Sequence, residues 1–395
     1  MKKQNDKNRR DFIKKSLLFS AGTFVAFPAC SKDALSMPPA KEQGIKYLTV
    51  AALKDRFFGW PANNGMWQWD NGREILLGFT NGNFEEQDGH NIGKEQLTNL
   101  ARSTDGGETW EREDPENFVG DEGEVIPSPG NILFGHPDFA LRVAARGYHG
   151  TNDKNGHFFI SYSRGKNWEG PYRFNGLNED ENLEGMEITS RTNYRISGDN
   201  SIQLFMTARN RELEFGNRLD KPFIAESNDG GKSFQFKGWA VPWTDQYRAV
   251  MPSVVHCTNG DLVMSVRRRN PRDKEQSCWV DAFVSKDEGG TWSFLSKIGD
   301  TGLNNGNPPG LAILKDGRLA CCYANRTSSK IFLRFSENNG ASWEEEIVVR
   351  DNPYSYDMGY PQLLQNSDGD LVALYYISTE ECPQSYIEAA IISGF

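Results

Sequence analysis

The sequence predicts an all-β fold, a single six-bladed β-propeller over residues 46–395. Three observations predict it: five copies of one turn motif, six hairpin signals in phase with them, and apolar residues that alternate with polar ones between the turns. The chain has 395 residues, 37% of them apolar and 12% aromatic, which is the composition of a folded globular protein. Helical periodicity is weak throughout.

The turn motif has the pattern Ser-x-Asp-x-Gly-x-x-Trp, and its copies begin 51 to 66 residues apart. In such a turn the Asp side chain accepts hydrogen bonds from nearby backbone N–H groups, and the Gly adopts a positive φ. The aromatic side chain then packs against the neighbouring sheet. We therefore interpret the Asp as structural rather than catalytic. The copies are residues 103–110, 227–234 and 285–292, with degenerate versions at 161–168 and 336–343.

The second repeat consists of turn dipeptides that precede short apolar strands, and each unit of about 50 to 65 residues predicts four strands. The last unit, from about Tyr360 onward, has no turn motif. We expect the segment from Tyr47 to Leu53 to complete its sheet, because closing the ring leaves no open strand edge. The dipeptides stand at 71–72, 130–131, 199–200, 259–260, 316–317 and 368–369, and the strand expected after the second of them is Ile132 to Phe134.

Residues 1–29 have the features of an export signal. Arg9-Arg10 is similar to the twin-arginine signal, and the apolar run Ser16–Ala29 is too short for a permanent membrane-spanning helix. Cys30 follows a small residue, as in a lipoprotein processing site. We expect lipidation of Cys30 and a periplasmic or membrane-anchored protein that touches the membrane only through its lipid; soluble release into the periplasm is the alternative. Residues 30–45 are then a linker.

The charge and the cysteines exclude several classes of partner. The net charge is −10, and the first 29 residues are basic, so the remainder is more acidic still. Such a surface repels a phosphate backbone, which argues against nucleic acid. The five cysteines after Cys30 have no metal-ligand spacing, and we expect no metal site and no cofactor, although Asp- and Asn-rich turns leave calcium open. A propeller closes its own edges, which favours a monomer.

The five turn motifs resemble the Asp-box, or BNR, repeats of the sialidase superfamily, and the resemblance covers nearly all of residues 45–395. It implies a propeller whose active site lies at the mouth of the central channel, on the face away from the Asp boxes. In sialidases an arginine triad binds the substrate carboxylate, a Tyr polarised by a Glu is the nucleophile, and an Asp is the acid/base.

Two positions match the catalytic residues of that family. Tyr360 lies in the strand that opens the last blade and matches the nucleophile, and Asp88 lies in the long loop 82–95 where the acid/base is found. Met251 stands where the Glu partner of the Tyr is expected. Without that Glu, Tyr360 would be a poor nucleophile, so the resemblance leaves the sugar specificity open.

The substrate-binding arginines match in part. Arg267 corresponds to the second arginine of the triad and Arg326 to the third. Gly59 occupies the place of the first, and Arg56 is its substitute. Lys330 and Arg334 are alternatives to Arg326.

Other residues near the expected channel indicate a different chemistry. His136 and Tyr148 fall in the second unit, His90 shares the loop of Asp88, and Arg191 falls in the third unit. A His or Tyr base, a Tyr acid and an arginine that neutralises a carboxylate are what β-elimination from a uronic acid needs. We therefore take His136 and Tyr148 as candidate catalytic residues, and His90 and Arg191 as candidate substrate-binding residues. A turn cap beside Pro137 is the alternative for His136.

Together these residues predict an exported carbohydrate-active enzyme, a glycoside hydrolase that acts on a terminal acidic sugar, sialic or uronic, of a glycan or oligosaccharide. One alternative is a lyase or dehydratase that acts on uronate-containing oligosaccharides by elimination. The second alternative is a non-catalytic glycan-binding lipoprotein, which the missing Glu and the missing first arginine motivate.

Overall fold

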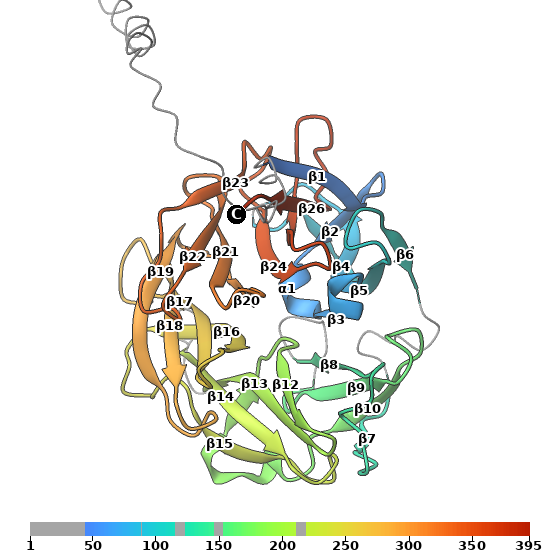
Figure 1. Ribbon diagram of the computed structural model, residues 1–395, viewed down its shortest axis with the longest axis vertical. Helices are drawn as coiled ribbons and strands as arrows, with labels where there is room; N and C mark the ends of the chain where they lie inside the picture. The colour runs from blue at the N-terminus through green and yellow to red at the C-terminus, as the bar shows by residue number, and fades with distance from the viewer. Residues whose placement is uncertain (1–43, 88, 115–122, 146–152, 211–218) are drawn as a thin grey trace, which may run out of the picture. The chain divides into compact units, whose positions relative to one another are not determined.

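Six β-sheets are arranged around a central channel in the computed structural model (Figure 1). The structure describes residues 44–87, 89–114, 123–145, 153–210 and 219–395. The sheets of the first and third blades have five strands, and the other four sheets have four. The predicted six-bladed propeller is confirmed.

The blades follow one another along the chain. The first three consist of β2 (Arg56–Gly59), β3 (Met66–Trp69), β4 (Glu74–Phe84), β5 (Ile92–Ser103) and β6 (Glu111–Glu113); β7 (Ile126–Pro127), β8 (Ala140–Ala144), β9 (His157–Ser161) and β10 (Glu169–Arg173); and β11 (Met186–Ile188), β12 (Tyr194–Gly198), β13 (Ser201–Asn210), β14 (Asp220–Ser227) and β15 (Gln235–Trp239). The last three consist of β16 (Arg248–His256), β17 (Leu262–Arg269), β18 (Ser277–Ser285) and β19 (Ser293–Leu303); β20 (Gly310–Ile313), β21 (Leu319–Asn325), β22 (Lys330–Ser336) and β23 (Ile347–Asp351); and β24 (Gly359–Gln365), β25 (Leu371–Ile377), β26 (Tyr386–Ser393) and β1 (Gly44–Ala51). The short helical turns are α1 (Pro61–Asn64), η1 (Asp70–Gly72), η2 (Leu177–Glu179) and η3 (Glu181–Leu183).

The N-terminal strand closes the ring as expected. Strand β1 pairs antiparallel with β26, from Gly44 opposite Ser393 to Ala51 opposite Ile387. The sixth blade is thus completed by a strand from the other end of the propeller. This pairing satisfies the edge of β26 and ties the first strand of the propeller to its last blade.

All five turn motifs form the predicted hydrogen bonds. In the copy at 285–292, Thr291 N donates to Asp287 Oδ1 at 2.8 Å, and Gly289 N donates to Ser285 Oγ at 2.8 Å. Gly289 has φ 88°, and Trp292 Nε1 donates to Gly289 O at 3.1 Å. Each motif joins the last two strands of its blade in chain order, and these turns mark one face of the propeller, the Asp-box face. The Asp side chains are structural, as the sequence indicates.

The second blade differs from the expectation. Residues 132–134 form no strand, and β8 takes the innermost position of that sheet. Gly130 and Asn131 both have positive φ, and Ile132 N donates to Gly230 O in the Asp box of the third blade. The segment therefore packs against a neighbouring turn instead of pairing within its own sheet, although Ile132 and Phe134 are buried as a strand would have been.

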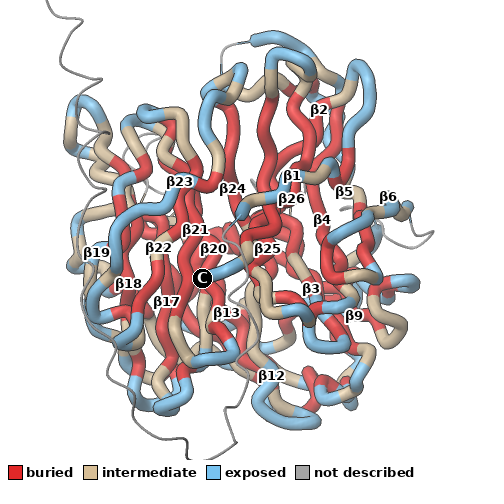
Figure 2. The backbone as a smooth tube through the Cα atoms, turned by 45° about the horizontal axis from the view of Figure 1, so that its top comes forward, coloured by how far each residue is buried: buried red, intermediate tan, exposed pale blue. Residues whose placement is uncertain are grey.

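The core lies between successive blades, where the apolar faces of adjacent sheets pack together. Between the fifth and sixth blades, for example, Ala320 and Leu333 belong to one buried cluster with Ala373 and Tyr375. Figure 2 shows buried residues along the strands and exposed residues in the connecting loops. The loops at the channel mouths are thereby left to carry function on a rigid frame.

Candidate functional site

Three innermost strands bring unusual residues together at the face opposite the Asp boxes. Trp60, Met251 and Tyr360 each precede a proline and each have a positive φ, of 53°, 57° and 52°. Such a conformation is unfavourable for a residue with a side chain, and strain of this kind concentrates at functional sites. All three side chains belong to one buried cluster. The first, fourth and sixth blades therefore meet here.

Two guanidinium groups flank the ring of Tyr360. Arg267, on β17, donates from Nη1 to the Tyr360 hydroxyl at 3.1 Å and from Nη2 to Asn305 Oδ1 at 2.8 Å. The guanidinium carbons of Arg267 and Arg326 lie 5.9 and 5.7 Å from the centre of the Tyr360 ring. Both arginines and the tyrosine are about 95% buried. A phenol oxygen that accepts from a guanidinium is stabilised when negative charge develops on it.

Asp357 links the remaining members of the cluster, Arg326, Tyr376 and His90. Its fully buried carboxylate accepts from Arg326 Nη2 at 3.2 Å and from the Tyr376 hydroxyl at 2.5 Å. Burial alone would raise the pKa of Asp357, but the hydrogen bond and charge of His90, with the charge of Arg326 and the Tyr376 hydroxyl, hold it below its usual value of 3.8. Asp357 is therefore an ionised carboxylate that joins an arginine to a histidine.

His90 is the exposed member of the cluster. Its Nδ1 lies 2.7 Å from Asp357 Oδ1, its side chain is 32% exposed, and its ring stands edge-on to Trp60 with the centroids 4.9 Å apart. Because a carboxylate only accepts hydrogen bonds, Nδ1 carries the proton of this bond, which leaves Nε2 as the ring nitrogen available to exchange a proton. A histidine oriented by a carboxylate in this way has the geometry of a general base.

The surroundings of the cluster are basic. Arg269, two residues beyond Arg267, has a pKa lowered to about 10, chiefly by burial and then by the charges of Arg248 and Arg267. Arg248 is paired with the buried carboxylate of Asp220. Cations that lie this close together create a positive potential, which attracts anionic ligands even though the whole chain is acidic.

Four of the residues predicted from the sequence meet in this cluster: Tyr360, Arg267, Arg326 and His90. The alternatives to Arg326 lie elsewhere. Arg334 donates to the backbone oxygens of Trp343 and Glu344 beside the fifth Asp box, and Lys330 begins β22 opposite Asp351. Arg326 is thus the basic residue of the fifth blade that reaches Tyr360.

Two predicted arginines lie outside the cluster. Arg56 donates to Asn81 Oδ1 at 2.9 Å and to Asn83, within its own blade. Arg191 is buried in the channel, where its guanidinium donates to Pro252 O at 3.0 Å and to Pro309 O at 3.0 Å. Neither contacts Tyr360 among the hydrogen bonds and ring contacts of the described residues. Arg191 instead ties the third blade to the fourth and fifth.

His136 is not at the place where it was expected. It lies on the Asp-box face, where its Nδ1 accepts from Asp138 N at 3.1 Å and its ring stands edge-on to Tyr162 of the second Asp box, 5.3 Å away. It caps a turn, because residues 132–139 run along that face instead of forming an inner strand. His136 therefore does not join the arginines. Asp88, Tyr148 and Cys30 lie outside the described residues.

Asp357 and Tyr376 were not among the residues predicted from the sequence. Asp357 stands three residues before Tyr360, in the loop that enters the sixth blade, and a polar residue so close to a candidate nucleophile was a usable signal. Tyr376 lies in the apolar run of β25 and has no feature that separates it from a core aromatic. Met251 contacts Arg267 through its Sδ, and within the described part of the chain no carboxylate bonds to the Tyr360 hydroxyl.

In the ranges that the structure describes, no group of three or more His, Cys, Asp and Glu side chains is placed to hold a metal ion. No helix in those ranges is long and apolar enough to cross a membrane. Calcium stays a prediction of the sequence alone.

Comparisons with known proteins agree with this fold. The BNR repeat-like domain matches residues 227–373, and the BNR/Asp-box repeat matches residues 101–112. No curated protein matches the chain. The chain thus carries Asp-box repeats on a six-bladed propeller.

Solved structures with the same fold are distant in sequence. A Dyadobacter fermentans protein of unknown function is 17% identical, with a TM-score of 0.66 over 89% of this chain and 100% of that one. The α-L-arabinanase of Penicillium chrysogenum is 14% identical, with a TM-score of 0.54 over 88% and 98%. A Hadza microbial sialidase is 15% identical, with a TM-score of 0.56 over 85% and 66%. These likenesses show the propeller fold.

Proposed function

We propose that this Asp-box propeller is a carbohydrate-active enzyme, a glycoside hydrolase that removes a terminal acidic sugar from an oligosaccharide. The observation that carries the proposal is the Tyr360 hydroxyl held at 3.1 Å by Arg267, in a basic cluster at the channel mouth. Guanidinium groups suit the carboxylate of such a sugar, and a tyrosine oxygen is a known alternative to a carboxylate nucleophile in sialidases. The fold shared with an arabinanase and a sialidase supports a sugar-cleaving role without selecting the sugar.

The proposed reaction proceeds in two displacements. The Tyr360 oxygen attacks the anomeric carbon, its proton passes to a base, and the bond from that carbon to the leaving oxygen breaks as an acid protonates that oxygen. Water then displaces the sugar from Tyr360. His90, which bonds to Asp357 in the same cluster as Tyr360, is a candidate for the base, and Asp88 stays the acid/base predicted from the sequence.

The test is a Tyr360→Phe variant assayed with a panel of sialosides and uronate-terminated oligosaccharides. We expect products that have gained one water from the wild-type protein, read by mass, and a loss of turnover of at least a thousandfold in the variant. Tyr354→Phe is the matched control, since Tyr354 is 56% exposed in the neighbouring loop, and it should keep its activity. Full activity of Tyr360→Phe would exclude Tyr360 as the nucleophile.

A second candidate is β-elimination from a uronate, which the His90–Asp357 pair favours. In that reaction His90 Nε2 removes the proton α to the carboxylate, an arginine neutralises the carboxylate, and Tyr360 protonates the departing oxygen. The product would be unsaturated, would absorb in the ultraviolet and would carry no added water. His90→Gln should then abolish turnover, whereas hydrolysis products would exclude this candidate.

Binding without turnover is the remaining alternative, and the absence of a carboxylate on Tyr360 within the described residues motivates it. Saturable binding of an acidic oligosaccharide with no change in its mass would identify a glycan-binding protein.

We further propose, from the N-terminal segment, twin-arginine export of a monomer anchored through lipidated Cys30. A Cys30→Ala variant should move from the membrane fraction to the soluble periplasmic fraction.

A further inference from the structure

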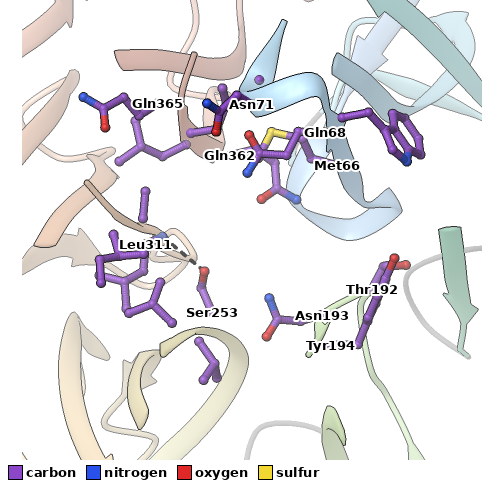
Figure 3. Close-up of a pocket in the computed structure, with 18 of the residues that line it drawn as sticks. Met66, Gln68, Asn71, Thr192, Asn193, Tyr194, Ser253, Leu311, Gln362 and Gln365 are labelled. Carbon is purple, nitrogen blue, oxygen red and sulfur yellow. Dashed lines mark hydrogen bonds between the residues drawn. The ribbon is translucent and has the colours of Figure 1, made fainter. Parts of the chain in front are cut away.

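We propose that the mouth of the channel on the Asp-box face is a second binding site, for a neutral sugar. A cavity of about 790 Å³ opens there, lined by innermost strands of five blades, β3, β12, β16, β20 and β24 (Figure 3). This volume lies within the range of about 300–1,000 Å³ that is typical of small-molecule sites. None of the residues named above for the Tyr360 cluster lines this cavity.

Carboxamide side chains without partners line the cavity. Gln68 on β3, Asn71 in η1, Gln362 on β24 and Asn193 just before β12 all line it, and none makes a side-chain hydrogen bond within the described part of the protein. Asn193 Oδ1 is buried and has no partner there. Figure 3 shows Gln68, Gln362 and Asn193 around one open space. Gln68 and Asn71 are exposed, and Gln362 and Asn193 are half-buried, so all four carboxamides are open to a ligand that enters the cavity. A buried polar atom is almost always bonded, so the Asn193 oxygen in particular is expected to bond such a ligand.

The chemistry of the wall selects a neutral, hydroxyl-rich ligand. A carboxamide both donates and accepts, which matches a sugar hydroxyl that does the same. The two cations on the rim are already bonded: Arg164 is paired with Asp70, Glu74 and Asp138, and Lys315 Nζ donates to Asn366 O and Ser367 O. Both cations that line the cavity are thus committed to groups of the protein, which leaves neither of them free to bind the carboxylate of an anionic ligand. The two ends of the channel therefore differ in charge preference.

Arg191 separates this cavity from the Tyr360 cluster. Along β16, Met251 contacts Arg267 in the cluster, while Ser253 lines the cavity. Between them, Pro252 O accepts from Arg191, which also donates to Pro309 O just before β20 of the fifth blade. A ligand in the cavity thus lies beyond this guanidinium from Tyr360, and the inference does not rest on the proposed reaction.

The experiment is calorimetric titration of the protein with lactose, cellobiose and xylobiose. We expect saturable one-site binding of at least one of them, weakened about tenfold in Gln68→Leu and in Gln362→Leu, since each variant removes one hydrogen-bonding group while keeping its volume. Gln235→Leu is the matched control, because Gln235 is an exposed carboxamide on the outermost strand β15, and its Kd should equal that of the wild type. Tyr360→Phe should also bind normally.

Three results would overturn the inference. The first is the absence of saturable binding by all three sugars, which would mean that the cavity holds water only. The second is an unchanged Kd in both cavity variants. The third is loss of binding in Tyr360→Phe, which would place the sugar at the opposite mouth. Gln68 is exposed, so its variant keeps the fold and the test stands even if Gln362→Leu does not fold; thermal unfolding checks both.

Discussion

Replacing Asp357 by Asn tests whether the candidate site is an electrostatic unit. The substitution keeps the shape of the side chain and an oxygen for Arg326 and Tyr376, but removes the negative charge. Arg326, whose side chain is 4% exposed, would be left as a buried cation without a counter-charge. Breaking a buried ion pair from one side costs about 3–5 kcal/mol. We therefore expect Asp357→Asn to lower the free energy of unfolding by about 3 kcal/mol, since its hydrogen bonds persist in part.

The assay is equilibrium unfolding in urea at neutral pH, with the slope compared between variants. Asp351→Asn is the control, because Asp351 is exposed on the edge strand β23, and it should change the stability by less than about 0.5 kcal/mol. The double variant Asp357→Asn with Arg326→Met should be more stable than Asp357→Asn alone, since it removes both buried charges. A loss below about 1 kcal/mol, or a double variant no better than the single one, would refute the reasoning.

The pH dependence gives an independent check on the same group. The folded protein holds the pKa of Asp357 below 3.8, so its contribution to stability is present above that value and is lost as the pH falls through the folded-state pKa. The wild type should lose stability relative to Asp357→Asn as the pH is lowered from about 5 toward 2. Parallel stability curves for the two proteins in that range would contradict the assigned charge.

Three further perturbations follow from the fold. In the Asp box at 285–292, hydrogen bonds from Thr291 lower the pKa of Asp287 to about 2. Asp287→Ala should therefore destabilise the protein at pH 7, and this loss of stability should disappear as the pH falls from about 4 toward 2. Thermal melting across this pH range measures the effect. Gly359→Ala should lower the free energy of unfolding by more than about 1 kcal/mol and impair any turnover. Gly359 has φ 105°, and the added Cβ would come within 2.3 Å of Asn307 Oδ1, which accepts from Tyr360 N. Unaltered melting would contradict this expectation. Deleting residues 44–51 should expose the edge of β26 and cause association, detected by light scattering, whereas a monodisperse product of equal stability would argue against ring closure by β1.

Much of the fold is predictable because its signals are local. Each Asp box satisfies its hydrogen bonds within eight residues, so the pattern at 285–292 is visible without knowing what surrounds it. The second blade shows the limit of this reasoning. Ile132 to Phe134 is as apolar as a strand, but its backbone bonds to Gly230 in the next blade, and that partner is nearly a hundred residues away.

The candidate site depends on much longer separations. His90 and Asp357 are 267 residues apart, and they meet only because the ring of blades closes. Residue type and the Asp-box resemblance were enough to select Tyr360, Arg267, Arg326 and His90, since few side chains suit that chemistry. They could not place His136, whose segment crosses to the Asp-box face, or find Tyr376, which is indistinguishable from a core residue along the strand.

The sequence by itself determined the architecture, the strand-closing segment and the kinds of residue available for chemistry, because periodic turns and alternation reflect short-range hydrogen bonding and burial. Only the tertiary structure decided which of them act together. The direction of an inner-strand side chain is set by the positive φ of Trp60, Met251 and Tyr360, and the partner of each charge is set by loops from separate blades. Arg191 illustrates the difference: its charge predicted substrate binding, yet its carbonyl partners on two other blades place it as a divider within the channel.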